Sequence, residues 1–108
     1  MLSSVGAHVI IADVNKKNGS DISEQFRSNG KKVDYIYCDV SSENSILEFV
    51  EFITKNYTAI KILMNFAGIG FEKNFIDTNL DDWNKIISVN LTGSFLITKE
   101  ISKIMISQ

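Results

Sequence analysis

The chain has 108 residues, of which 44% are hydrophobic and 22% are charged, and its formal net charge is −2. This composition fits one small folded domain and excludes a disordered protein. The charge argues against a nucleic-acid partner, because phosphate binding needs a concentrated excess of Lys and Arg. The longest apolar run, Val9 to Ala12, is far too short to span a bilayer, so we expect a cytoplasmic protein without a membrane partner.

The first part of the chain alternates between strand and helix patterns. The apolar, β-branched run His8–Ala12 predicts a buried strand that ends at Asp13. A sparse apolar stripe over Lys16–Ser28 predicts a helix. A second strand is predicted over Val33–Cys38, and it ends at Asp39.

The second part of the chain continues this alternation. Ser41 or Ser42 is expected to cap the clearest helix of the sequence. Ile62–Met64 predicts a third strand that ends at Asn65, and a long helix is predicted from Leu80 to Met105. The apolar face of the capped helix is formed by Ile46, Leu47, Phe49, Val50 and Ile53.

Strands and helices that alternate at these lengths indicate right-handed βαβ units around a parallel sheet. The expected fold is therefore α/β, with a Rossmann-like parallel sheet. All three predicted strands end at a polar residue, namely Asp13, Asp39 and Asn65. Ligands of open α/β sheets bind outside the carboxyl ends of the strands, so we expect these residues to converge on one crevice.

An aspartate at the end of an early strand has the position of the acid that binds the ribose hydroxyls of an adenine nucleotide. Asp13 would repel a 2′-phosphate and therefore favours NAD over NADP, a preference that Lys16 and Lys17 would soften. Asp39 and Val40 come next along the same rim and suit the adenine edge. Methyltransferases that use S-adenosylmethionine place an acid at the same position, so this class stays open as an alternative.

The segments after the third strand carry a family resemblance. Asn65-Phe66-Ala67-Gly68 resembles the Asn-Asn-Ala-Gly turn of the short-chain dehydrogenase/reductase family, with Phe66 as a departure. Ser88-Val89-Asn90-Leu91-Thr92-Gly93 is similar to the family's Asn-bearing helical segment. Gly6-Ala7, the strand end at Asp13 and Cys38-Asp39-Val40 fit the same family in the same order, so the resemblance covers nearly the whole chain.

The resemblance implies an NAD(P)-dependent oxidoreductase that moves hydride between a nicotinamide ring and a carbonyl or alcohol carbon of a small molecule. Residues 1–108 would form a partial NAD(P)-binding Rossmann-like domain. Asp13 would bind the adenosine ribose, and Asp39 with Val40 the adenine. The backbone that lines the cofactor would be that of Asn65, Ala67 and Gly68. As the catalytic residue, Asn90 would hold a water of the proton relay through its main-chain carbonyl, where the helix is locally distorted.

The sequence also departs from the family. It lacks the first strand with the Gly-rich turn that holds the pyrophosphate, and it has no catalytic Ser or Tyr-x-x-x-Lys pair after Asn90. Tyr57 and Lys61 have the right spacing, but they precede the third strand. Lys61 would lie roughly 13 Å from Asn65, at about 3.3 Å per residue, so this pair is rejected.

We therefore expect an internal fragment without the first strand and the C-terminal half, which is inactive on its own. The resemblance implies that the absent strand would lie between the strands that end at Asp13 and Asn65. The backbone groups of those two strands would then lack partners, so we expect the fragment to be poorly stable.

Two other hypotheses stay open at this point. The chain could be a methyltransferase fragment, or a non-catalytic module that pairs through the predicted helix 80–105. The same helix could also join copies of the chain into a homo-oligomer. Other conspicuous side chains are expected to be structural: His8 at the surface, Cys38 in the core, and Trp83 and the Phe residues in packing. No metal site is expected, because His8 has no neighbouring Cys or His cluster.

Overall fold

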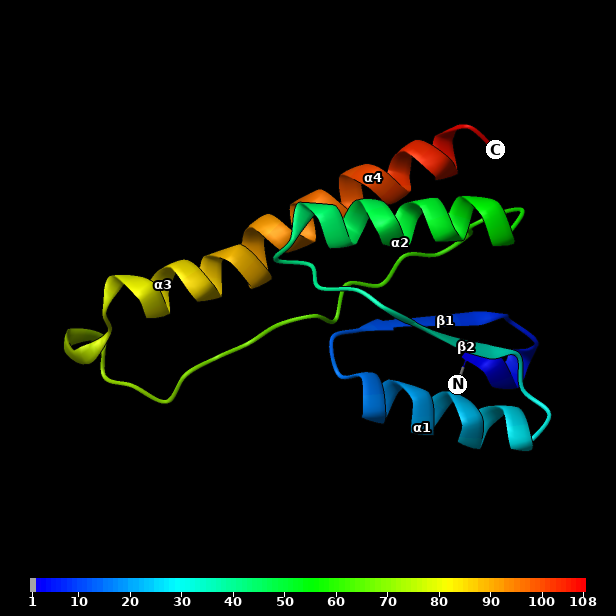
Figure 1. Cartoon of the computed structure of the whole chain (residues 1–108), viewed down its shortest axis with the longest axis horizontal. Coiled ribbons are helices and arrows are strands. Elements are labelled where there is room, and N and C mark those ends of the chain that lie inside the picture. The colour runs from blue at the N-terminus through cyan, green and yellow to red at the C-terminus, as the bar shows by residue number, and fades with distance from the viewer. Residues whose placement is uncertain (1) are drawn as a thin grey trace. The chain divides into compact units, whose positions relative to one another are not determined.

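The structure is a computed structural model that describes residues 2–108. Its contacts divide the chain into two compact units, one ending at Asp39 and the other comprising Val40–Gln108. They are named the N-terminal unit and the C-terminal unit. The helices and strands of both are labelled in Figure 1. The α/β class with a parallel sheet is confirmed.

The N-terminal unit is a βαβ unit preceded by a 3₁₀ turn, η1 (Leu2–Val5). Its strands β1 (Val9–Asp13) and β2 (Val33–Tyr37) pair in parallel, and α1 (Lys16–Ser28) connects them (Figure 1). In the register of the pair, Val9 lies opposite Val33 and Asp13 lies opposite Tyr37. The two predicted strands and the helix between them are confirmed, and Asp13 is the last residue of β1.

Both ends of α1 are determined by local hydrogen bonds. The Asn15 side chain accepts a hydrogen bond from the Asn18 amide at 3.0 Å, which satisfies a group that the first turn leaves unpaired. After the last turn, Gly30 adopts a φ of +72°, in the left-handed region that favours glycine. The Gly30 amide donates to the Arg27 carbonyl at 2.9 Å, so the helix ends where the sequence predicts.

Burial in the N-terminal unit is lower than the sequence pattern predicts. Val33 and Cys38 are each only 3% exposed, which confirms Cys38 as a core residue. The run from Val9 to Ile11 is half-buried and Ala12 is exposed, so the prediction of a buried first strand is wrong. The described sheet has two strands, and α1 packs against both of them. One helix on a two-stranded sheet leaves much of the strand surface accessible.

The C-terminal unit contains two helices that pack against each other, α2 (Glu43–Asn56) and α4 (Ser94–Ile106) (Figure 1). Of the two predicted caps, Ser42 is the one that caps α2, because its hydroxyl accepts a hydrogen bond from the Ser45 amide at 3.3 Å. The buried core of this unit consists of Ile46, Phe49, Ile53, Ile97 and Ile101. Leu47, expected on the apolar face, is 47% exposed, because it lies about 100° around the helix from Ile46.

The long helix predicted from Leu80 to Met105 consists of three consecutive segments. α3 (Leu80–Ile87) is followed by a π-helical turn, η3 (Ser88–Gly93), and then by α4. A short 3₁₀ turn, η2 (Phe75–Asp77), precedes them. The Asn79 side chain caps α3 by accepting a hydrogen bond from the Asp82 amide at 2.8 Å. The helix is therefore distorted in the segment that contains Asn90.

The third predicted strand, Ile62–Met64, is wrong. This segment is part of a long stretch without regular structure between α2 and η2, and the described sheet contains only β1 and β2. Ile62 is 62% exposed and Met64 is 52% exposed. A strand exists only through hydrogen bonds to a neighbouring strand, and no described residue supplies that neighbour here.

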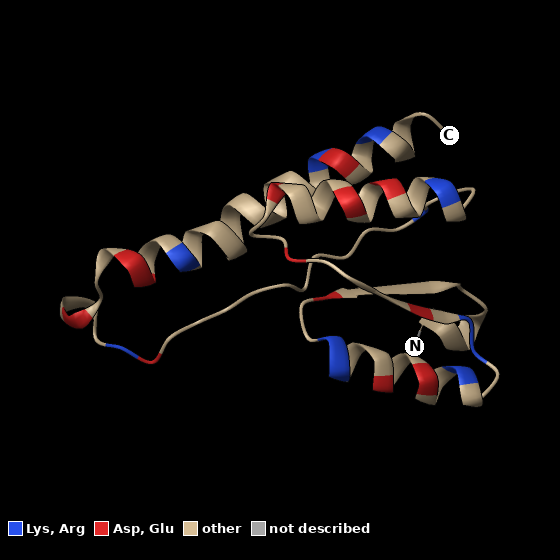
Figure 2. Ribbon diagram, viewed as in Figure 1, with Lys and Arg blue, Asp and Glu red and all other residues tan. Residues whose placement is uncertain are grey.

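The surface of the chain combines charged helices with exposed aromatic rings. Both signs of charge occur along α1 and α2, whereas residues 86–98 carry none (Figure 2). Trp83 is 54% exposed and Phe75 is 89% exposed, so the packing prediction is wrong for these rings and correct for Phe49. α3 packs chiefly on the adjoining η3, which leaves Trp83 accessible. No helix among residues 2–108 is both long and apolar enough to cross a membrane.

Candidate functional site

Asp13 ends β1 at an exposed edge of the N-terminal unit. Its Oδ1 accepts a hydrogen bond from the Asn15 amide at 2.8 Å, which orients the carboxylate at the start of α1. Tyr37 lies opposite Asp13 in the strand register and is 43% exposed. The Lys16 Nζ lies 4.8 Å from the centroid of the Tyr37 ring. A carboxylate, an aromatic ring and a cation therefore gather at the carboxyl edge of the two strands.

The main chain at Asp13 is held by two donors. The Tyr35 hydroxyl donates to the Asp13 carbonyl oxygen at 2.9 Å, and the Cys38 amide donates to the same oxygen at 3.3 Å. Partial burial raises the pKa of Tyr35 above its ordinary value of 10.0, and the nearby Asp13 and Tyr37 raise it further. The Tyr35 hydroxyl is therefore a neutral donor at neutral pH. Asp39 follows Cys38 and is half-buried.

In the C-terminal unit, Asn90 clamps the loop that follows Asn65. Its Oδ1 accepts a hydrogen bond from the Ile69 amide at 2.8 Å, and its Nδ2 donates to the Ile69 carbonyl at 2.8 Å. Gly68 lies beside this clamp, since a Cβ built on it would be 3.6 Å from Asn90 Oδ1. The side chain of Asn90 thus binds the loop, whereas its main-chain carbonyl has a different partner.

That carbonyl accepts a hydrogen bond from the Ser94 hydroxyl at 2.9 Å. The Ser94 amide donates to Leu91, within the π-helical region. A carbonyl oxygen has two lone pairs, so Asn90 can accept a second donor such as water. The geometry is compatible with a main-chain acceptor for water at Asn90.

Two further predicted residues lie against the same helical segment. A Cβ built on Gly93 would be 2.7 Å from the Val40 carbonyl oxygen, so only glycine lets η3 approach Val40 this closely. The Asn65 Nδ2 donates to Thr98 Oγ1 at 2.8 Å. A mainly apolar hollow of about 440 Å³ lies there, lined by Asn65, Leu91, Ser94, Phe95, Thr98 and Lys99. Ala67 is exposed in the loop between these contacts.

The structure therefore brings Val40, Asn65, Gly68 and Asn90 together around η3 and the start of α4, and it places Asp13 and Asp39 in the N-terminal unit. Convergence of Asp13, Asp39 and Asn65 on one crevice stays a prediction, because Asn65 belongs to a different unit from the two aspartates. Sequence reasoning missed Ile69 and Thr98. Ile69 acts through its backbone and carries no side-chain signal. Thr98 follows Asn90 by two helical turns, so helical spacing could have indicated it.

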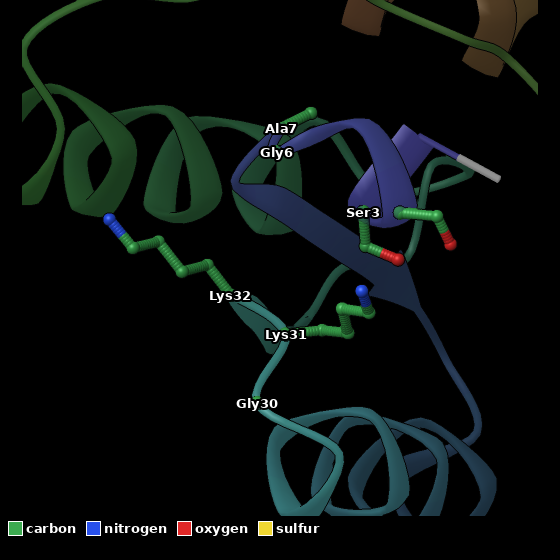
Figure 3. A pocket seen from close by; sticks show the side chains of 7 residues that line it. Ser3, Gly6, Ala7, Gly30, Lys31 and Lys32 are labelled. Carbon is green, nitrogen blue, oxygen red and sulfur yellow. The ribbon is translucent and has the colours of Figure 1, made fainter.

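A second hollow lies at the opposite end of the N-terminal unit from Asp13. It measures about 210 Å³ and is lined by Ser3, Ser4, Gly6, Ala7, Gly30, Lys31 and Lys32. Figure 3 shows that Lys31 extends toward Ser3, whereas Lys32 points away. The lining precedes β1 and β2, at the amino ends of the strands. This hollow is therefore not part of the predicted cofactor site.

The remaining candidates agree with structural roles. His8 is exposed, as predicted, and its Nε2 lies 2.6 Å from Asp34 Oδ2. No cluster of three metal-ligating side chains occurs within residues 2–108. Tyr57 directly follows α2, and Lys61 lies in the irregular stretch after it.

Comparison with known proteins shows the family to which this chain belongs. Residues 1–108 match the family model described as short chain dehydrogenase. The chain is 35% identical over 104 residues to (21S)-21-acetoxyl-apo-melianone synthase of Melia azedarach, covering 94% of this chain and 37% of that relative. It is 35% identical over 108 residues to 3-oxoacyl-[acyl-carrier-protein] reductase of Aquifex aeolicus, covering 99% of this chain and 44% of the relative.

A solved structure gives the same picture. The gluconate 5-dehydrogenase of Burkholderia cenocepacia J2315, crystallised with NADP and tartrate, matches with a TM-score of 0.88 and 28% identity. The match covers 98% of this chain and 42% of that structure. The chain thus spans about two fifths of the length of the proteins it resembles.

Proposed function

Because the chain belongs to the short-chain dehydrogenase family, we propose that it is part of an NAD(P)-dependent oxidoreductase that transfers hydride between a nicotinamide and a carbonyl or alcohol carbon. The strongest support from the structure is the Asn90 clamp. It fixes the small-residue loop after Asn65 to the π-helical turn that contains Asn90. The family match favours this activity over the methyltransferase alternative.

Each predicted cofactor contact is assigned to its own residue. Asp13 would bind the adenosine ribose with a carboxylate that Asn15 orients, and Asp39 with Val40 would contact the adenine. The loop residues Asn65, Ala67 and Gly68 would approach the cofactor through their backbone, which fits their small size and exposure. When bound, the nicotinamide supplies the hydride that the chain's own residues cannot provide.

The Asn90 carbonyl would hold a water of the proton relay, with Ser94 bound to the same oxygen. No Tyr-x-x-x-Lys pair follows Asn90 within the 108 residues. We therefore expect no substrate turnover by these 108 residues alone, and cofactor binding is the property to test.

Cofactor binding is tested by titrating NADH into the 108-residue chain and following the nicotinamide fluorescence. We expect enhancement in the wild type and roughly 10- to 100-fold weaker binding in Asp13→Ala, since a hydrogen bond to a charged group contributes about 1.5–3 kcal/mol. Asp21→Ala is the matched control, because it removes an exposed carboxylate from α1 away from the strand end. Absent enhancement, or equal affinities in the two variants, would contradict the proposal. Parallel titration with S-adenosylmethionine tests the alternative class.

Selectivity between the two nicotinamide cofactors follows from charge. Asp13 would repel the 2′-phosphate of NADPH, so we expect tighter binding of NADH than of NADPH. Lys16 is held near the same edge by Tyr37 and should limit this preference. Asp13→Asn should reduce the preference for NADH over NADPH, and Lys16→Ala should increase it. A wild-type chain that binds NADPH more tightly would overturn the assignment of NAD.

A homo-oligomer formed through α3 and α4 is a second element of the proposal. Large apolar side chains are exposed along α3, η3 and α4, and they include Leu80, Trp83, Leu91, Phe95 and Ile106. Light scattering after size exclusion should show a dimer or larger species for the wild type. Phe95→Ser should shift it toward monomer, whereas Phe75→Ser, an exposed ring outside these helices, should not. A monomeric wild type would contradict this part.

A further inference from the structure

We propose that Tyr35 is the residue that positions Asp13 for ribose binding. It would act by fixing the main chain at the end of β1 with its hydroxyl and by seating its ring in a space that Gly19 leaves open. The inference rests on the proposed role of Asp13 in cofactor binding. It assigns a function to a side chain in the middle of β2, which no motif singles out.

The hydroxyl contact is the first step. Tyr35 Oη lies 2.9 Å from the Asp13 carbonyl oxygen, across 22 positions of sequence. The Cys38 amide approaches the same oxygen at 3.3 Å from the end of β2. A carbonyl oxygen with two donors is held from two directions, so the peptide after Asp13 has one orientation. That peptide leads directly to Asn15, whose amide binds the Asp13 carboxylate at 2.8 Å.

The ring contact is the second step. A Cβ built on Gly19 would lie 2.2 Å from both Cδ2 and Cε2 of Tyr35 and 2.9 Å from Cγ. Real Cβ atoms essentially never come this close to another atom, so any other residue at position 19 would displace the ring. Gly19 is buried in the first half of α1 although glycine weakens a helix by roughly 1 kcal/mol relative to alanine. The missing side chain at this position is explained by the ring of Tyr35.

These contacts connect three elements at the point where the carboxylate lies. Tyr35 belongs to β2, its ring packs on α1, and its hydroxyl reaches the last residue of β1. Its hydroxyl is protonated at neutral pH, because the pKa of Tyr35 lies above the ordinary tyrosine value of 10.0. The hydroxyl therefore donates to the main chain beside Asp13 and leaves the carboxylate itself available to a ligand.

A readout specific to the ribose separates positioning from general stability. ADP carries the ribose 2′-hydroxyl that Asp13 would bind, and 2′-deoxy-ADP lacks it. The ratio of their dissociation constants therefore reports only on the contact between the carboxylate and that hydroxyl. Loss of fold weakens both ligands together and leaves the ratio unchanged.

The experiment measures both dissociation constants by calorimetry for the 108-residue wild type, Tyr35→Phe, Asp13→Ala and Tyr57→Phe. We expect the wild type to prefer ADP and Tyr35→Phe to lose about three- to tenfold of that preference, as for removal of one hydrogen bond. Tyr57→Phe, which removes a hydroxyl in the C-terminal unit, should keep the wild-type ratio. Asp13→Ala should abolish the preference, and Tyr35→Phe should have no further effect in that background.

The other outcomes are equally informative. A wild type without preference for ADP contradicts the role of Asp13 and, with it, the proposed function. A wild type with the preference and a Tyr35→Phe variant that retains it contradicts the present inference alone. Should Tyr35→Phe fail to fold, Gly19→Ala keeps the hydroxyl and displaces the ring. It must lower the same ratio, and an unchanged ratio would overturn the inference.

Discussion

The segments predicted as strands form a sheet in the N-terminal unit but not in the C-terminal unit. In the N-terminal unit, β1 and β2 pair along their whole length, from Val9 opposite Val33 to Asp13 opposite Tyr37. In the C-terminal unit, the apolar run Ile62–Met64 has no regular structure, whereas α2 before it forms as expected. A helix satisfies its backbone hydrogen bonds within its own segment, whereas a strand depends on a neighbour.

The same contrast holds for packing. The C-terminal unit has a core of isoleucines and Phe49 between α2 and α4, and the N-terminal unit is held mainly by strand pairing and by single close contacts such as Gly19 with Tyr35. Substitutions that remove core volume should therefore act most strongly in the C-terminal unit. Substitutions at polar contacts should act locally.

The largest expected effect is loss of the helical core. Ile101→Ala removes a side chain that is only 2% exposed and should cost about 2–5 kcal/mol of unfolding free energy. Ile101→Val is the graded control, at about 0.5–1.5 kcal/mol. Hydrogen exchange should show α2 and α4 opening while the amides of β1 and β2 stay protected. Equal loss of protection in both units would show that they unfold as one.

The next effect concerns the two glycines near Asn90. Gly93→Ala places a Cβ 2.7 Å from the Val40 carbonyl oxygen, so the backbone must shift, and we expect a cost of about 1–3 kcal/mol. Gly68→Ala meets Asn90 Oδ1 at an ordinary 3.6 Å and should be nearly neutral. Urea denaturation of both variants measures the difference. A Gly93→Ala variant as stable as Gly68→Ala would contradict the close approach of η3 to Val40.

Removal of the Asn90 clamp should cause a smaller loss of stability, confined to the loop around Ile69. Asn90→Ala deletes both hydrogen bonds to Ile69, each contributing about 0.5–1.5 kcal/mol at most in this exposed position. Asn90→Asp retains the acceptor for the Ile69 amide and loses the donor to its carbonyl. Exchange at the Ile69 amide should therefore be fast in the alanine variant and intermediate in the aspartate variant. Unchanged exchange in both variants would contradict the clamp.

The smallest effect is an alkaline loss of stability. The pKa of Tyr35 is raised above 10.0 in the folded chain, chiefly by burial and also by Asp13 and Tyr37. Well below pH 10, Tyr35 is neutral in both the folded and the unfolded chain. As the pH rises past 10.0, Tyr35 ionises first in the unfolded chain. The free energy of unfolding therefore falls until the pH has passed the pKa of Tyr35 in the folded chain. Urea denaturation at pH 8 and above pH 10 should show a steeper loss for wild type than for Tyr35→Phe, and parallel losses would argue against this contact.

Local signals in the sequence were sufficient for most of the fold. Helix α1 lies over the predicted residues because Asn15 and Gly30 act within one turn of its ends. Ser42 does the same for α2. Asp13 was located as a strand end because the β-branched run stops there, and Asn90 was indicated by its resemblance to a known segment. In each case the signal lies within a few residues of the feature.

Contacts between distant positions were decided by the tertiary structure alone. The sequence does not show that Tyr35 contacts Asp13 or that Asn90 binds Ile69. It also does not show that Val40 packs closely against Gly93. Each of these contacts joins residues that are 20 or more positions apart. The run Ile62–Met64 has the composition of a strand, but composition cannot supply a pairing partner. The sequence by itself determined where α1 and α2 begin and end and which residues have ligand-binding chemistry. The tertiary structure decided which of these residues meet, because that depends on packing and pairing across the chain.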